Sequence, residues 1–341
     1  MLLKIGERSK TAPIPVASLR LLRLKPPRCG FQHILPPLPS RRLPWALFFV
    51  LALSFLPSAR TSSDSSAKAT PTSAWSLAQS DPHALVRAAV ENEFNNSYGH
   101  RPPVRYMLRK KTRNLDTTKE IVETSDGGVA RLVAIRNQPL SAAQTQAEIE
   151  RLRELASDPA AQQHRNRSER KDAAQLAGIM RVLPDAFFNQ FAGSVETPNG
   201  PAIRLTFTPN PHFSPPTLES RILTGIRGEI WIDPTDLRVV QIEGRLFRTV
   251  DYGWGILGTL YPGGTISIEQ TRTPECGWQL AHLNLNLVGR ALILKPLNIV
   301  VDETATDYHS VPKNWKFTDA VDWLLQMPAT TPTAQIELPH P

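Results

Sequence analysis

The chain has 341 residues, which is enough for one large domain or two modest ones, and a formal net charge of +8. Residues 1–60 hold ten of the 39 Lys and Arg residues but one of the 31 acidic residues, which leaves 29 basic and 30 acidic side chains over residues 61–341. Proteins that bind phosphate backbones concentrate positive charge on the folded domain. We therefore expect no nucleic-acid partner.

Residues 1–60 have the features of a targeting segment. Arg41 and Arg42 precede an apolar run from Leu43 to Leu56. This run fits the core of a signal peptide and is short for a membrane span, which needs roughly 20 apolar residues. If the segment is cleaved, the domain is exported to the periplasm. If it is retained, it is an N-terminal inner-membrane anchor, and membrane contact is expected through it alone.

The next segment predicts a linker followed by a helix and a small meander. Residues 61–80 are rich in Ser, Thr and Ala, a composition typical of a disordered linker. Order is expected from Asp81, a good helix cap that is followed by Pro82 and by apolar residues at helical spacing. Strands are predicted over residues 106–115, 119–124 and 129–135. Asp126-Gly-Gly128 should form the turn before the last of them, with a positive φ at a glycine.

The hydrophobic period changes to that of helices from Ser141, so we predict a helical insertion over residues 141–192. Its end carries a dense aromatic cluster, formed by Phe187, Phe188 and Phe191. Such a cluster closes a core or lines a ligand site. The chain should then return to a strand near residues 203–207, followed by a proline-rich loop and a short helix over residues 217–223.

Residues 225–308 read as one strand after another. Residues 228–233 and 237–246 alternate polar and apolar side chains on either side of the turn Asp233-Pro-Thr-Asp236. Further strands are expected over residues 265–270, 278–287, 291–294 and 297–301. The pattern predicts an α+β domain, mainly antiparallel β, over residues 81–327. A disordered proline-rich tail should follow over residues 328–341.

No catalytic or metal-binding signature is present, so we expect a protein that is not an enzyme and has no metal or cofactor. The histidines share no metal-ligand spacing. Asp302, Glu303 and Asp307 could form a crowded carboxylate pair, but their position at the expected end of a strand favours solvated charges. Cys276 lies in a turn with no fixed basic partner nearby in sequence, which favours an unreactive thiol.

Short segments of the meander carry a family resemblance. They are Gly228-Glu-Ile-Trp-Ile-Asp-Pro234, Val240-Gln-Ile-Glu-Gly-Arg-Leu246, Gly264-Thr-Ile-Ser-Ile268, Trp278-Gln-Leu280, Gly289-Arg-Ala-Leu292 and Tyr308. With the preceding helix and strands, residues 84–310 resemble the outer-membrane lipoprotein-sorting family, which includes the periplasmic carrier LolA and related sensor domains. The resemblance implies a curved incomplete β-barrel whose concave face is covered by helices and holds a lipid acyl chain or lipoprotein. The helical insertion and the tail depart from this pattern.

Two interpretations of function follow. The first is a non-enzymatic, exported binding protein for a lipid or lipidated partner, with the helical insertion as a lid. The second is a structural or protein-interaction β domain of the cell envelope. An open apolar cavity on the concave face favours the first, and a filled core favours the second. The residues expected to line the cavity are Phe187, Phe188, Phe191, Ile230, Ile232, Ile266, Ile268, Leu283 and Leu285.

Overall fold

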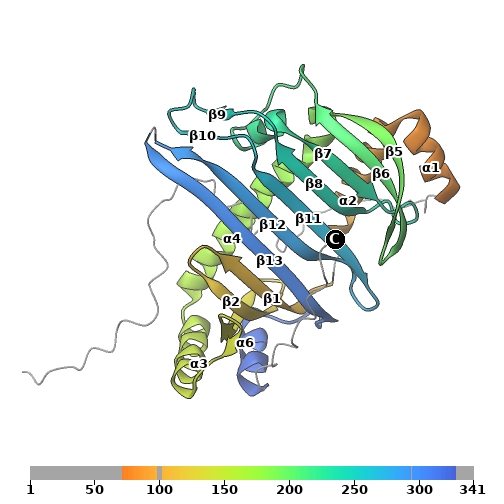
Figure 1. Ribbon diagram of the computed structural model, residues 1–341. Coiled ribbons are helices and arrows are strands. Elements are labelled where there is room, and N and C mark those ends of the chain that lie inside the picture. The colour runs from red at the N-terminus through yellow and green to blue at the C-terminus, as the bar shows by residue number, and fades with distance from the viewer. Residues whose placement is uncertain (1–70, 98–101, 293, 328–341) are drawn as a thin grey trace, which may run out of the picture. The chain divides into compact units, whose positions relative to one another are not determined.

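The structure is a computed structural model that describes residues 71–97, 102–292 and 294–327 (Figure 1). The predicted signal peptide or anchor, the first half of the linker and the tail lie outside these residues. Within the described part of the chain, no helix is long and apolar enough to cross a membrane.

The fold is a 13-stranded antiparallel sheet that does not close into a barrel, with several helices, which confirms the predicted α+β incomplete barrel. Its strand order is β4-β3-β2-β1-β13-β12-β11-β8-β7-β6-β5, and β9 and β10 pair beside β12. The strands are β1 (Val104–Thr112), β2 (Asp116–Val122), β3 (Val129–Ile135), β4 (Gln138–Pro139), β5 (Phe187–Thr197), β6 (Gly200–Pro209), β7 (Ile226–Ile232), β8 (Val239–Leu246), β9 (Val250–Tyr252), β10 (Gly258–Leu260), β11 (Thr265–Thr273), β12 (Gly277–Ala291) and β13 (Lys295–Ser310).

Seven helices lie within the described residues, and the long helix α4 runs along the sheet in Figure 1. They are α1 (Pro71–Ser80), α2 (Pro82–Ser97), α3 (Ala142–Ser157), α4 (Pro159–Arg181), α5 (Leu183–Ala186), η2 (Glu219–Gly225) and α6 (Phe317–Gln326). Asp81 accepts a hydrogen bond from the Ala84 amide at 2.9 Å, as expected of a cap before α2. Ser141 and Gln144 form a capping box at the start of α3.

Two predicted boundaries are wrong. Residues 71–80 form helix α1 instead of linker, because Ala74 and Ala78 lie one turn apart on one face and are buried in the main core. The helical insertion ends at Ala186 instead of residue 192. Phe187 already belongs to β5, whose backbone pairs with β6 from Phe187 opposite Pro209 onward. In both places tertiary packing, not local composition, decides the structure.

The main core lies between the sheet and helices α1, α2 and η2, with α4 packed at its edge. A second core joins α3 and α6 to β2 and β3, and helix α6 was not predicted.

At two positions the backbone geometry requires glycine. Gly127 has φ +131° in the predicted turn before β3, as expected. Gly228 lies directly opposite Gly244, and a Cβ atom at Gly228 would lie 1.8 Å from the Glu243 carbonyl oxygen, so only glycine lets β7 and β8 approach.

Candidate ligand-binding site

An apolar cavity of about 110 Å³ lies between the middle of the sheet and the helices that cover it. Strands β7, β8 and β11 provide Ile230, Ile242, Ile266 and Ile268. The other lining residues are Val90, Glu93, Leu176, Ile179, Met180, Leu183, Phe187, Phe207, Ile222, Leu223, Ile226, Val239, Gly244 and Gln270. Only Glu93 and Gln270 bring polar side chains to this wall.

The register of the strands explains why the isoleucines meet. Ile230 lies opposite Ile242, Ile242 lies opposite Ile268, and Ile268 lies opposite Leu283, so one row of branched side chains crosses four strands on the same face. Ile230 and Leu283 are buried, whereas Ile242 and Ile268 are only partly buried because they border the cavity. The row is therefore covered at its ends and open in its middle.

A second apolar cavity of about 90 Å³ lies beside the first, and Ile222 of η2 lines both. Its lining residues are Glu219, Ile222, Tyr252, Leu257, Gly258, Thr259, Leu260, Leu285, Leu287, Arg290, Ala291, Leu297 and Ile299. Burial raises the pKa of the Tyr252 hydroxyl, which keeps Tyr252 neutral. Glu219 and Arg290 are the charged side chains of this lining. The two cavities are separate neighbours on the covered face of the sheet, with Ile222 between them.

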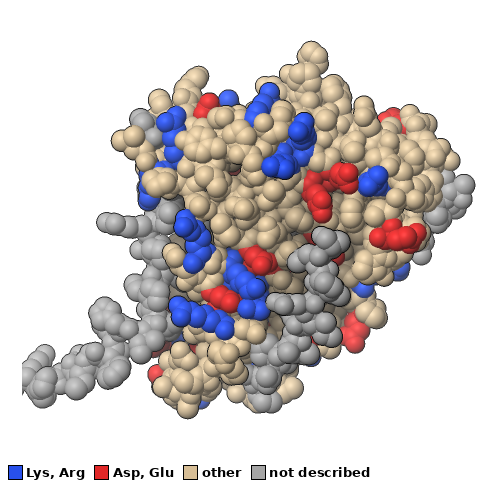
Figure 2. Space-filling view, viewed as in Figure 1, with Lys and Arg blue, Asp and Glu red and all other residues tan. Residues whose placement is uncertain are grey.

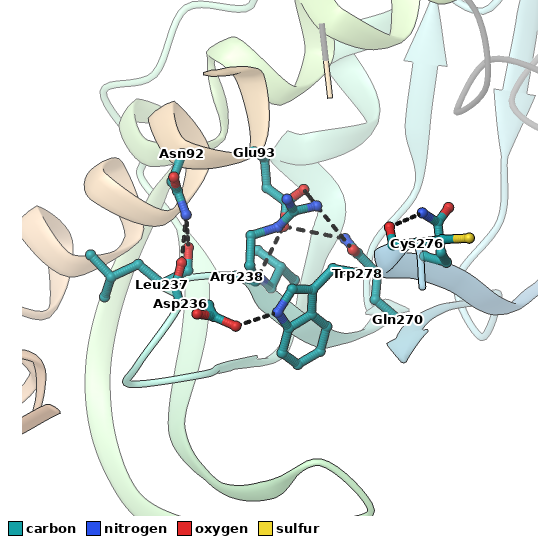
Figure 3. Close-up of polar contacts among 10 residues, drawn as sticks. Asn92, Glu93, Asp236, Leu237, Arg238, Gln270, Cys276 and Trp278 are labelled. Atoms are coloured by element: carbon teal, nitrogen blue, oxygen red, sulfur yellow. Dashed lines mark hydrogen bonds and ion pairs between the residues drawn. The ribbon is translucent and has the colours of Figure 1, made fainter. Parts of the chain in front are cut away.

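A buried ion pair closes the α2 side of the first cavity (Figure 3). Glu93 of α2 accepts hydrogen bonds from Arg238 Nε at 2.8 Å and Nη2 at 2.7 Å. It also accepts from the Val239 amide at 3.0 Å and from Gln270 Nε2 at 3.3 Å. Glu93 and Arg238 are 2% and 8% exposed. The carboxylate is therefore fully engaged by protein donors, which suits it to fix α2 over β8 and not to act as a free base.

The turn before β8 holds α2 by further polar contacts. Asn92 Nδ2 donates to the Leu237 carbonyl at 3.1 Å, and Trp278 Nε1 donates to Asp236 Oδ2 at 2.9 Å. Asp233 accepts from the Thr235 amide at 3.0 Å, which confirms the predicted Asp-Pro-Thr-Asp turn. The hairpin turn thus links helix α2, which covers the cavity, to strand β12 of the sheet.

The predicted cavity residues separate into three groups. Phe187, Ile230, Ile266 and Ile268 line the first cavity and Leu285 lines the second. Ile232 and Leu283 lie in the core, 0% and 2% exposed. Phe188 and Phe191 are 52% and 36% exposed and line neither cavity, so they do not belong to the candidate site. Strand alternation explains Phe188, which points to the face opposite Phe187 once both belong to β5. Phe191 has the same phase as Phe187, but its ring packs edge-to-face on Trp75 of α1, with 6.4 Å between the ring centroids, and it lines neither cavity.

Sequence reasoning missed Glu93, Arg238 and the η2 contribution of Ile222. Glu93 follows Val90 by three residues, so it shares the apolar face of α2, and an acidic residue on such a face is a usable signal of a buried partner. No local pattern pairs it with Arg238, which is 145 residues away. That partner depends on the fold.

The prediction of solvated carboxylates near residue 302 is wrong for Glu303. Strand β13 continues to Ser310, and Glu303 is 3% exposed and lies 2.8 Å from Lys110 Nζ of β1. Asp302, on the other face, lies 2.8 Å from His282 Nε2 and remains partly exposed. The two carboxylates thus engage different partners. Within the described residues no group of three potential metal ligands is gathered.

Burial raises the pKa of Glu303 above its ordinary value of 4.5, although Lys110 partly opposes this. Between the two pKa values the folded protein keeps a proton that the unfolded chain has released, so the free energy of unfolding falls as pH rises above about 4.5. Glu303→Gln should reduce this slope in urea titrations at stepped pH. Part should persist, because burial also raises the pKa values of Glu169 and Asp172. If the pH dependence of the unfolding free energy is the same in Glu303→Gln as in the parent, Glu303 does not have a raised pKa in the folded protein.

Comparisons with known proteins find similarity in structure but none in sequence. No family model matches the chain, and no curated protein matches its sequence. A solved domain from Vibrio parahaemolyticus, assigned to outer membrane lipoprotein sorting, is similar over 71% of this chain and 98% of its own length, with 10% sequence identity and a TM-score of 0.27. At this degree of similarity, function must be inferred from the cavities and surface of the chain itself.

Proposed function

We propose that the protein is a non-enzymatic, exported binding protein for a lipid acyl chain or a lipidated partner. The observation that carries the proposal is the pair of neighbouring apolar cavities on the covered face of the sheet, with Ile242, Ile266 and Ile268 left partly uncovered. Small-molecule sites are concave, mainly apolar and limited to a few polar groups, as here. The leader-like residues 1–60 support export.

The size of the cavities sets a condition on binding. About 110 Å³ is less than the roughly 150 Å³ of an apolar cavity that holds one benzene molecule, and ligand sites usually span about 300–1,000 Å³. A long acyl chain therefore requires the two cavities to join past Ile222, or α4 to move away from the sheet. This matches a lid formed by the helical insertion.

Filling the first cavity should weaken acyl binding strongly without unfolding the domain. Ile268→Phe adds a ring where the structure has free space, so we expect fluorescent fatty-acid binding to weaken at least tenfold and the melting temperature to change little. Val300→Phe is the matched control, since Val300 is 37% exposed and points to the opposite face. Native mass spectrometry of the purified parent protein would show the lipid that it carries.

The alternative function is a structural or protein-interaction β domain. The two cavities are small and the core around them is extensive, and both observations favour this alternative. It predicts no fatty-acid binding by the parent protein and no co-purified lipid. If both assays are negative while the domain is folded, the binding proposal is rejected.

A further inference from the structure

Two neighbouring turns carry the most exposed apolar side chains of the described residues. One joins β9 to β10 and the other joins β12 to β13. Strand β10 pairs with β12 through Gly258 and Ala291, and the Leu292 amide donates to the Leu257 carbonyl at 3.3 Å, so the turns lie side by side (Figure 1). We call this pair of turns the apolar tip. Its four exposed side chains are Trp254, Ile256, Leu292 and Leu294.

The exposure of these side chains is large. Trp254 is 95% exposed, Leu294 86%, Leu292 61% and Ile256 56%, above every other large apolar side chain of the described residues. An indole and three aliphatic side chains in water cost free energy that burial in an apolar medium would recover. Gathered apolar exposure of this kind marks an interaction site.

The backbone of the apolar tip is held in an unfavourable conformation. Trp254 has φ +53° and Leu292 has φ +47°, in the left-handed region that bulky residues rarely adopt. Gly253 and Gly255 flank Trp254 with φ +56° and +80°. Such strain persists where the surrounding structure imposes it, and it is enriched at functional positions. Here it accompanies side chains that project into solvent.

Basic side chains accompany the apolar tip. Residues 245–262 and 286–300 contain four basic residues, Arg245, Arg248, Arg290 and Lys295, and one acidic residue, Asp251. Figure 2 shows blue patches, and less red, among the tan surface around β9 and β10. Arg245 lies directly opposite Arg227, a like-charge pair that favours a nearby anion.

We propose that the apolar tip docks the protein on a lipid bilayer with anionic headgroups. The apolar side chains would enter the interface while the basic residues contact the headgroups. The tip consists of two projecting turns and not of a flat patch or pocket, and it carries a tryptophan, which is enriched at membrane interfaces. Leu257, Gly258 and Ala291 beside it also line the second cavity, so docking would bring that cavity to the bilayer. The docking does not require the cavity to hold a ligand.

Trp254→Gly combined with Leu294→Asn tests the proposal on the full chain. Glycine suits the positive φ at position 254, so the fold should be retained, with a melting temperature equal to or above that of the parent. Partitioning into vesicles of phosphatidylcholine with phosphatidylglycerol should fall roughly tenfold or more, since two apolar contacts are lost. Added salt should weaken binding by the parent. Phe188→Ala removes an exposed aromatic residue of β5, an edge strand that pairs with none of the strands joined by the tip, and should bind as the parent does.

Brominated lipids identify which tryptophan enters the bilayer. The difference in quenching between the parent and Trp254→Gly isolates Trp254 from the other six tryptophans, including Trp45 of the apolar leader run. We expect this difference signal to be quenched. No quenching of Trp254, vesicle binding that equals the parent in the double variant, or loss of self-association in place of vesicle binding would overturn the proposal. Fatty-acid binding without vesicles should be unchanged in the variant. This assay tests the cavity proposal independently of the docking proposal.

Discussion

Replacing Glu93 by alanine should lower the free energy of unfolding by about 3–5 kcal/mol. The substitution leaves Arg238, which is 8% exposed in the parent protein, without its carboxylate partner, and it also removes the acceptor of the Val239 amide and of Gln270. A buried charge without a partner is costly because water no longer solvates it. Urea unfolding followed by circular dichroism measures the loss.

Two further variants separate the ion pair from helix α2 itself. Glu91→Ala, on the exposed side of the same helix, should change the free energy of unfolding by no more than about 0.5 kcal/mol. Glu93→Leu combined with Arg238→Met should be less destabilising than Glu93→Ala, because apolar residues of similar volume can replace a buried pair. If Glu93→Ala and Glu91→Ala behave alike, Glu93 does not anchor α2 in solution.

Much of the sheet could be predicted from the sequence because its strands have a strict two-residue period. The alternation in residues 228–233 and the turn at Asp233-Pro-Thr-Asp236 specify β7, β8 and their hairpin locally. Gly127 likewise occupies the turn that its sequence indicates. Each of these features depends on residues close together in the chain, so no knowledge of distant partners is needed.

The candidate site could be predicted only in part, because it depends on the phase of one strand and on distant partners. Assigning Phe187 to a helix hid the fact that Phe187 and Phe188 face opposite sides of β5. The pairing of Glu93 with Arg238 joins residues 145 positions apart. The apolar tip was also missed, since the turns that carry Trp254 and Leu294 come together only when β10 pairs with β12. Register and long-range pairing are set by tertiary structure.

Phe187→Ala and Phe188→Ala should differ sharply although the residues are adjacent. Phe187 is 7% exposed, and its ring centroid lies 4.6 Å from the ring centroid of Phe207. Its truncation should therefore cost about 3–5 kcal/mol of unfolding free energy. Phe188 is 52% exposed, so its truncation should cost no more than about 0.5 kcal/mol. A larger loss for Phe188→Ala than for Phe187→Ala would mean that β5 is shifted by one residue, since such a slip exchanges the two faces of a strand. Equal losses would contradict the placement of the two side chains on opposite faces.

The same pair distinguishes a ligand cavity from a filled core. Phe187 lines the first cavity, so removing its ring enlarges the space available to an acyl chain. If the cavity binds lipid, the folded fraction of Phe187→Ala should still bind a fluorescent fatty acid, and saturating fatty acid should raise its melting temperature, because a ligand that binds only the folded state stabilises it. Phe188→Ala should bind as the parent does. A Phe187→Ala protein that is destabilised but gains nothing from fatty acid would indicate that Phe187 serves packing alone.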